Sequence, residues 1–131
     1  AVMATGGSVG IQTSAIVIRA LGMGTINTSQ AFKVILSELK LSLFLGAICG
    51  LIAGTFGFYI TGDTYTGANF FTVIFFSLSS ASVISAIFGA AFPLVLNKFN
   101  IDPANGSGPF VTMANDMFSA ISYLLIALLF I

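Results

Sequence analysis

The chain has 131 residues, of which 57% are hydrophobic and only 6% are charged, and its formal net charge at pH 7 is zero. With a mean hydropathy of +1.09, this composition is typical of integral membrane proteins and excludes an ordinary soluble domain. The balanced charge, with no basic cluster, argues against nucleic acid as a partner. Histidine is absent, which removes Ser-His and Cys-His catalysis and imidazole metal sites, so we expect no enzyme.

Four apolar segments are predicted to cross or nearly cross a membrane, at about 1–21, 41–60, 70–97 and 109–131. Inside lipid each segment must satisfy its own backbone hydrogen bonds, and runs of about 20 residues do so as helices. The predicted fold is therefore an all-α polytopic bundle, a single transmembrane domain over residues 1–131 whose main solvent is the lipid bilayer. Because the chain opens at Ala1 without Met or a charged leader, we expect a piece of a longer protein rather than a signal peptide.

The first segment is rich in glycine, with Gly6, Gly7 and Gly10 inside the run 5–12. Each interior glycine costs a helix up to about 1 kcal/mol relative to alanine, so an ordinary lipid-facing helix would avoid them. These glycines either expose carbonyl groups to a pore or admit a closely packed neighbour. The Gly-Lys-Ser/Thr ending of a phosphate loop is absent, so nucleotide binding is not expected.

The stretch 27–40 is predicted to form an amphipathic lead-in helix on the cytoplasmic surface. The run Asn27-Thr28-Ser29 is a candidate N-cap, and the apolar residues recur at helical spacing: Phe32, Ile35, Leu36 and Leu39.

Small residues recur every three or four positions in the second and third segments, at Gly46, Gly50, Gly54 and Gly57, and at Ser77, Ala81, Ser85 and Gly89. This spacing favours close helix packing in lipid, where no hydrophobic force brings helices together. The lone Cys49, in the same apolar stretch, is interpreted as a packing residue. Pro93 is predicted to kink or end the third segment.

Charges between the segments predict the orientation. Arg19, Lys33 and Lys40 flank the first connection and Lys98 opens the third, whereas the second carries only Asp63. By the positive-inside rule the first and third connections are cytoplasmic, and the C-terminal end reaches the external face.

The fourth segment contains the strongest functional signal, Asp116. A helix over 109–131 would span about 35 Å and place this carboxylate about 10 Å along it, inside the hydrocarbon region. An ionised carboxylate there costs at least a few kcal/mol and usually marks an ion or proton path. The alternative is a protonated Asp that hydrogen-bonds a neighbouring helix.

Thr112, Asp116, Ser119 and Tyr123 share one face of this predicted helix, and the cationic residues all lie at segment ends. A cation or a proton would therefore have to neutralise the carboxylate. Carboxylate, carbonyl and hydroxyl oxygens suit hard cations such as Mg²⁺, which commonly keeps several waters and is bound through one or two carboxylates. Sodium and protons stay open at this point.

Three stretches together indicate a family: Gly6 to Gln12 with Arg19-Ala20-Leu21, then Pro93, then Asp102-Pro103-Ala104 through Ser107-Gly108-Pro109 to Asp116. They resemble the transmembrane domain of MgtE-type magnesium channels over nearly the whole chain. The resemblance implies a homodimer of five-helix subunits whose Mg²⁺ pore lies at the dimer interface, lined by the second and fifth helices. The four segments of this chain then match helices two to five.

The resemblance further implies that Asp116 holds a hydrated Mg²⁺ ion, helped by backbone carbonyls at Thr112, with Gly6, Gly7 and Gly10 in the pore wall. Ser8 and Ile11 depart from the family, which commonly has Asn at the first position and often at the second. The cytoplasmic regulatory portion typical of bacterial members is absent from these residues. We expect an integral, multi-pass protein of the cell (inner) membrane with no cofactor other than its transported ion.

Two other functions stay open on the sequence alone. A proton- or sodium-coupled carrier would use Asp116 as its coupling site, and a non-transporting assembly subunit would use it to bind a partner helix. An intramembrane aspartyl protease would need a second carboxylate, for which Asp102 would have to reach Asp116 from a loop.

Overall fold

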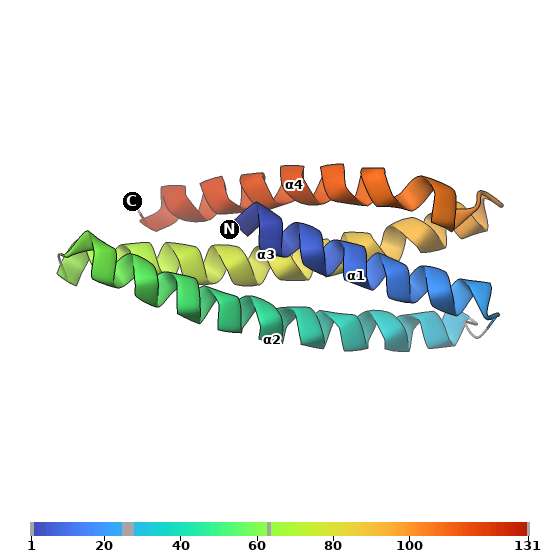
Figure 1. Ribbon diagram of the computed structural model, residues 1–131, viewed down its shortest axis with the longest axis horizontal. Helices are drawn as coiled ribbons and strands as arrows, with labels where there is room; N and C mark the ends of the chain where they lie inside the picture. The colour runs from blue at the N-terminus through green and yellow to red at the C-terminus, as the bar shows by residue number, and fades with distance from the viewer. Residues whose placement is uncertain (1, 25–27, 63, 131) are drawn as a thin grey trace.

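The computed structural model describes residues 2–24, 28–62 and 64–130, apart from the side chains at 28, 29, 31, 64, 65, 106 and 107. These residues form four helices and no strand: α1 Val2–Gly22, α2 Thr28–Thr61, α3 Thr64–Lys98 and α4 Pro103–Phe130 (Figure 1). The predicted all-α helical bundle is confirmed. The predicted N-cap Asn27 and the loop residue Asp63 lie outside the described residues.

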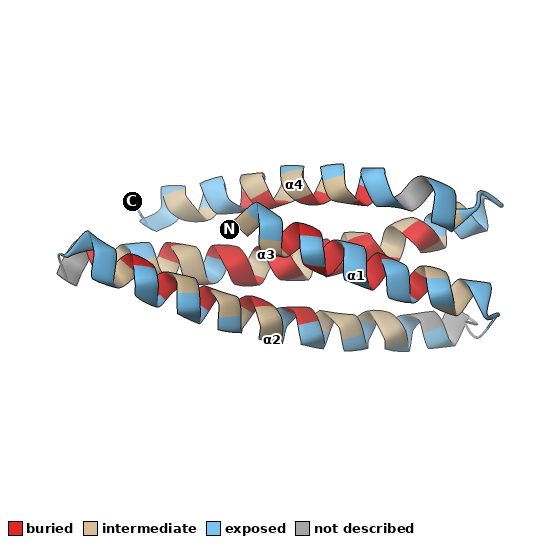
Figure 2. Ribbon diagram, viewed as in Figure 1, coloured by how far each residue is buried: buried red, intermediate tan, exposed pale blue. Residues whose placement is uncertain are grey.

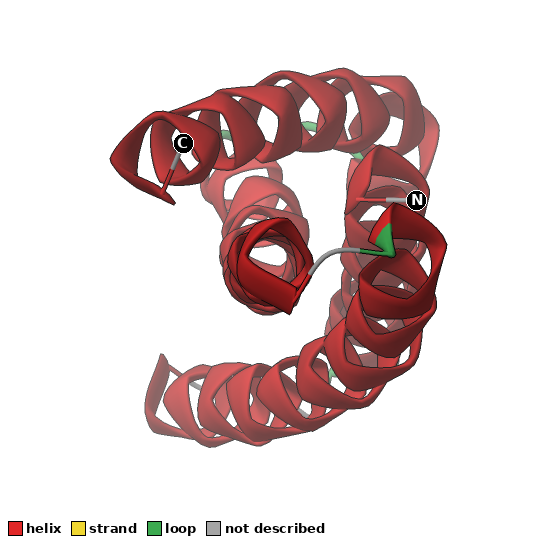
Figure 3. Ribbon diagram, turned by 90° about the vertical axis from the view of Figure 1, so that its left-hand side faces the viewer, coloured by secondary structure: helices red, strands yellow, loops and turns green. Residues whose placement is uncertain are grey.

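The helices lie side by side along one direction, with α3 in the middle of the bundle (Figures 1 and 3). Helix α3 contacts each of the other three, and α1 packs against both α3 and α4. Across the described ranges, α2 and α4 do not contact each other. The geometry of α4 is therefore set by α3 and α1 alone.

Helix boundaries differ from the predicted ones in several places, among them the start of α3, which lies at Thr64, six residues before the predicted start. The lead-in stretch and the second apolar segment form one continuous helix, α2, whose 34 residues span about 51 Å. Whether its first turns lie on a membrane surface stays a prediction. Pro93 does not end α3, which continues to Lys98. Helix α4 begins at Pro103, six residues before the predicted start.

The earlier start of α4 has a local cause. Asp102 caps the helix: the backbone N–H of Ala104 donates to its Oδ1 at 3.0 Å, and the side-chain amide of Asn105 donates to its Oδ2 at 3.1 Å. Pro103 occupies the first helical position, where no backbone N–H is needed. Just before it, Asn100 takes a left-handed conformation with φ of 58°, and the N–H of Ile101 donates to the Leu96 carbonyl at 3.0 Å, which closes the end of α3.

Among the described residues, three helical stretches are long and apolar enough to cross a membrane: 32–61, 66–98 and 108–130. Helix α1 is not among them. Its buried residues include glycines and hydroxyl side chains and face the other helices (Figure 2): Gly6, Gly7, Val9, Gly10, Thr13, Ser14 and Val17. Since protein rather than lipid covers this face, α1 needs less apolar surface than its neighbours.

The predicted packing role of the glycines in α2 is confirmed, because all four are buried against α3. A Cβ built on Gly54 would lie 2.7 Å from the Phe71 ring, and one built on Gly57 would lie 2.6 Å from the Phe70 ring. At Gly50 the nearest atom is the Phe75 carbonyl oxygen, at 3.0 Å. The two helices thus approach so closely that only glycine fits.

Stacked phenylalanine pairs join α3 to α4 along their length. The ring centroids lie 4.4 Å apart for Phe88 and Phe118, 5.8 Å apart for Phe92 and Phe110, and 6.4 Å apart for Phe76 and Phe130. These contacts fix α4 on the central helix along one flank and leave its other flank to α1.

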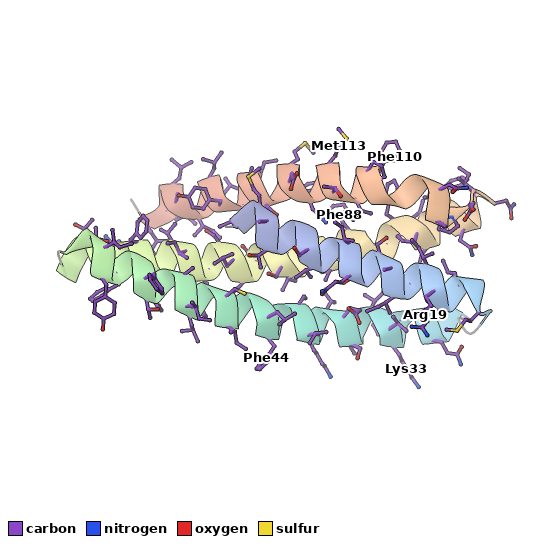
Figure 4. The ribbon with its side chains drawn as sticks, viewed as in Figure 1. Arg19, Lys33, Phe44, Phe88, Phe110 and Met113 are labelled. Carbon is purple, nitrogen blue, oxygen red and sulfur yellow. The ribbon has the colours of Figure 1, made fainter. Side chains whose placement is uncertain are left out.

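Three of the four basic residues lie at one end of the bundle, whereas Lys40 lies twelve residues into α2. Arg19 in the last turn of α1 and Lys33 near the start of α2 lie at the same end (Figure 4), and Lys98 ends α3 there. This arrangement is the one that the positive-inside argument requires, and the orientation itself stays a prediction.

Candidate ion site at the crossing of α1 and α4

Asp116 lies on α4, eight residues or about 12 Å inside the apolar stretch that begins at Gly108. Its side chain is half-buried. A Cβ built on Gly7 would lie 3.9 Å from Asp116 Oδ1, so the carboxylate sits beside a stretch of α1 that carries no side chain. The carboxylate is therefore held at the edge of the bundle, where α1 and α4 meet.

Of the three predicted glycines, only Gly7 contacts Asp116 in this way. A Cβ on Gly6 would lie 2.6 Å from Ser119 Oγ and 2.9 Å from Ser85 Oγ, and a Cβ on Gly10 would overlap the carboxamide of Asn115. Gly6 and Gly10 therefore face the interior of the protomer rather than the carboxylate.

Thr112, one turn before Asp116, is also half-buried. Its hydroxyl donates to the Gly108 carbonyl at 3.0 Å within the same helix. The hydroxyl of Thr112 is thus engaged with the preceding turn, and a contribution of its backbone to an ion site stays a prediction.

The polar stripe predicted on α4 divides into two parts. Ser119 is fully buried, whereas Thr112 and Asp116 are half-buried and Tyr123 is 38% exposed. The buried face of α4 carries Asn115, a residue that the sequence reasoning did not single out. Asn115 precedes Asp116 and stands four residues before Ser119, so its helical spacing was the signal that could have identified it.

Several buried polar atoms around this crossing have no hydrogen-bond partner. They include Asn115 Nδ2 and Oδ1, Ser119 Oγ and Ser85 Oγ, and all three residues are 0% exposed. Buried polar groups normally find partners, because leaving one unpaired costs about 1–3 kcal/mol. The interface of α4 with α1 and α3 thus contains buried polar side chains that make no hydrogen bond.

The basic side chain on α1 lies far along the helix from the carboxylate. Arg19 is twelve residues beyond Gly7 on α1, or about 18 Å along the axis. Within the described ranges, no three His, Cys, Asp or Glu residues come together as a metal site. A single carboxylate with nearby backbone can hold a hard, hydrated cation through oxygen contacts and water.

A second carboxylate lies in a membrane-length helix and was not singled out from the sequence. The hydroxyl of Thr13, which is 1% exposed, donates to Oε2 of Glu38 at 3.3 Å, from α1 to α2. Thr13 lies about two turns beyond Gly7 on the way to the basic end of the bundle.

Asp102, the only candidate considered for a second carboxylate beside Asp116, is held elsewhere. It caps α4 and lies fourteen residues, about 21 Å along the helix, from Asp116. Its role in this structure is to start α4.

The family model described as "MgtE: Divalent cation transporter" matches residues 1–126. The chain is similar to curated proteins named magnesium transporter MgtE, with 32% identity to that of Bacillus subtilis, 31% to that of Enterococcus faecalis and 28% to that of Thermus thermophilus. These alignments cover 95%, 96% and 95% of the chain but only 27% of each relative. The chain thus spans about a quarter of the length of these relatives.

The match extends over all four helices and includes both elements of the crossing, the glycines of α1 and Asp116 of α4. Together with the membrane-length helices, it identifies an integral membrane protein. On these grounds the chain belongs to the MgtE divalent cation transporter family.

Proposed function

We propose that this domain passes Mg²⁺ across the membrane as part of a homodimer and that Asp116 is the carboxylate ligand of the hydrated ion. The observation that carries the proposal is the placement of Asp116: half-buried, at membrane depth, beside the bare backbone of Gly7. A carboxylate in this position is costly unless a cation or proton accompanies it. Gly7 leaves room for that companion and its water.

Magnesium is favoured over other cations by two arguments. The three relatives from Bacillus, Enterococcus and Thermus are named magnesium transporters. Mg²⁺ also dehydrates reluctantly, so a site with one carboxylate and flanking backbone oxygens, such as the Thr112 carbonyl, suits an ion that keeps most of its waters.

The homodimer is supported by the surface of α4. Large apolar side chains lie exposed on α4, among them Met113, which is 71% exposed and points outward from the bundle (Figure 4). A two-fold axis near the α1–α4 edge would bring two copies of Asp116 toward one path and double its negative charge. The pore would then be lined by α1 and α4 of both subunits.

The remainder of the protein belongs to the same proposal. Because the chain covers 27% of the length of the relatives, we place a cytoplasmic regulatory domain outside these residues. It would sit at the basic end of the bundle, marked by Arg19 and Lys98, in a protein of the inner cell membrane.

The test is Mg²⁺ influx into liposomes that contain the intact natural protein, with a magnesium gradient and no other ion gradient. Asp116→Asn keeps the shape of the side chain and removes its charge. We expect influx to fall by about tenfold to a hundredfold, since a contact to a charged group contributes about 1.5–3 kcal/mol.

The matched control is Asp102→Asn, which makes the same chemical change on the same helix. Asn caps helices about as well as Asp, so α4 should form normally and influx should stay near that of the wild type. Equal effects of the two substitutions would refute the assignment of Asp116. Influx by the wild type only when a sodium or proton gradient is added would replace the channel by a coupled carrier.

A further inference from the structure

At the crossing of α1 and α4, two side chains of α4 each fill the space beside a glycine of α1. The carboxamide of Asn115 occupies the space that a Cβ on Gly10 would take, and the hydroxyl of Ser119 lies 2.6 Å from where a Cβ on Gly6 would be. We call Gly6 and Gly10 the sockets. A larger residue at either position would displace the opposing side chain from its place against α1.

The two contacts together fix one arrangement of the helices. The sockets are four residues apart on α1, and the side chains that enter them are four residues apart on α4, in antiparallel order. Each spacing corresponds to one helical turn, about 6 Å of rise. A shift of α4 by a single residue would empty both sockets at once, so the pair specifies both the height and the rotation of α4.

Hydrogen bonds from Asn115 and Ser119 do not help to fix the position of α4. The polar atoms of Asn115 and the hydroxyl of Ser119 have no hydrogen-bond partner, although both residues are 0% exposed. No hydrogen bond in this structure therefore holds these two side chains in the interface, whereas their shape matches the sockets. Shape is the property that positions the helix at this crossing.

Asp116 directly follows Asn115, so the height at which Asn115 enters its socket sets the height of the carboxylate beside Gly7. A slip of one residue would move Asp116 by about 1.5 Å along the axis and turn it by about 100°. Sites that hold ligands require placement within about 0.5 Å.

We infer that Asn115 and Ser119 are positioning residues for Asp116 and that Gly6 and Gly10 serve as their sockets rather than as surfaces in contact with the ion. The inference rests on the proposed role of Asp116. It assigns different tasks to neighbouring glycines: Gly7 faces the carboxylate, and the other two hold α4 in register.

The test adds side-chain volume on one side of a socket and removes it from the other side, in the intact natural protein. Gly10→Ala alone should raise the half-saturating Mg²⁺ concentration for influx by about tenfold, because a misplacement of about 1 Å can have effects of this size and larger. The double variant Gly10→Ala with Asn115→Ala moves the missing volume to the other side and should return the value to within about threefold of the wild type.

The matched control is Gly10→Ala combined with Ser119→Ala. It removes the side chain that fills the Gly6 socket and should not restore the half-saturating Mg²⁺ concentration. Should Gly10→Ala fail to fold, Asn115→Ala alone empties the socket without a clash and should still raise the half-saturating concentration. Failure of the double variant to restore a folded Gly10→Ala protein, or equal restoration by the control, would overturn the inference.

A second readout separates this inference from the proposed function. In protein whose native cysteines, Cys49 included, are replaced by alanine, the rate at which a water-soluble thiol reagent modifies Asp116→Cys reports its position without requiring Mg²⁺. We expect Gly10→Ala to change this rate about tenfold and Asn115→Ala to restore it in the double variant. An unchanged rate in Gly10→Ala would refute the positioning role, even if Asp116 binds the ion.

Discussion

Two glycine-based interfaces in this bundle differ in what fills the space that the glycines leave. On α2, Gly50 and Gly54 receive the backbone of Phe75 and the ring of Phe71, so the α2–α3 contact is close-packed and largely apolar around these two glycines. On α1, Gly6 and Gly10 receive Ser119 and Asn115, whose buried polar atoms have no partner. The comparison teaches that glycine spacing identifies a close helix crossing, and that the opposing side chain decides whether the crossing serves stability or function.

The two interfaces differ in the free energy of burying the side chains that fill the space beside their glycines. An aromatic ring against glycine gains dispersion contacts and leaves no polar group unpaired. A buried carboxamide without partners costs free energy, and natural proteins tolerate such a cost mainly at functional sites. We therefore expect the α2–α3 contact to stabilise the fold and the α1–α4 contact to position Asp116.

Among the variants that compare the two interfaces below, Gly50→Ala should give the largest change in stability. Its Cβ would meet the Phe75 carbonyl at 3.0 Å and Phe75 Cα at 3.1 Å, and backbone cannot rotate away. We expect a loss of up to about 3 kcal/mol in unfolding free energy, with influx per folded protein unchanged. Denaturant titration of the purified protein measures the loss. Gly22→Ala is the control, since nothing lies within 4 Å of its Cβ; similar losses in both would contradict the account.

Asn115→Leu should act in the opposite direction. Leucine has nearly the shape of asparagine, so the Gly10 socket stays filled while two unpartnered buried polar atoms disappear. We expect the unfolding free energy to rise by about 1 kcal/mol, with the half-saturating Mg²⁺ concentration near that of the wild type. If the variant is stabilised but influx is lost, the amide group itself takes part in conduction and shape is not its only role.

Thr13→Val tests the contact between α1 and α2. The substitution keeps the shape of the side chain and removes the hydroxyl that donates to Glu38. A loss of about 1 kcal/mol in unfolding free energy is expected. Thr55→Val is the comparison, because the Thr55 hydroxyl is exposed and bonds only to carbonyls of its own helix. Equal stability of the two variants would show that the Thr13 contact contributes nothing.

The smallest effect is expected at Ser80 and Ser122, whose hydroxyl groups lie 2.7 Å apart between α3 and α4. Hydrogen bonds between membrane helices average about 0.6 kcal/mol in double-mutant cycles. The cycle formed by Ser80→Ala and Ser122→Ala should give a coupling energy of this size. A coupling energy larger than that of the Asn115 and Gly10 pair would show that the serine contact, not the socket, is the stronger link to α4.

Much of the fold was predictable because its signals are local. Apolar runs identified the helices, and the spacing of Gly46 to Gly57 identified a packing face that the structure confirms. Boundaries were less predictable: the cap formed by Asp102 and Pro103 starts α4 earlier than its apolar run, and Pro93 is accommodated inside α3. In both places, capping and packing outweighed the local preference on which the prediction relied.

The candidate site was predictable only in part. Asp116 stands out as a charge in an apolar run, but helical spacing allows two polar faces on α4, one through Thr112 and Asp116 and one through Asn115 and Ser122. Only the packing of α1 and α3 shows which face is covered. The different tasks of Gly7 and Gly10 depend likewise on a crossing between residues that are far apart in the sequence.

That separation in sequence bears on how the chain enters a membrane during synthesis. Gly10 is made 105 residues before Asn115, the side chain that fills its socket. Helix α1, which is not among the helices apolar enough to cross a membrane, therefore emerges before α3 and α4 and must wait for them before its buried face is covered. The packing of α1 is thus expected to be completed only after α4 has been made, so that in a protein truncated within α4 the buried face of α1 would stay partly uncovered.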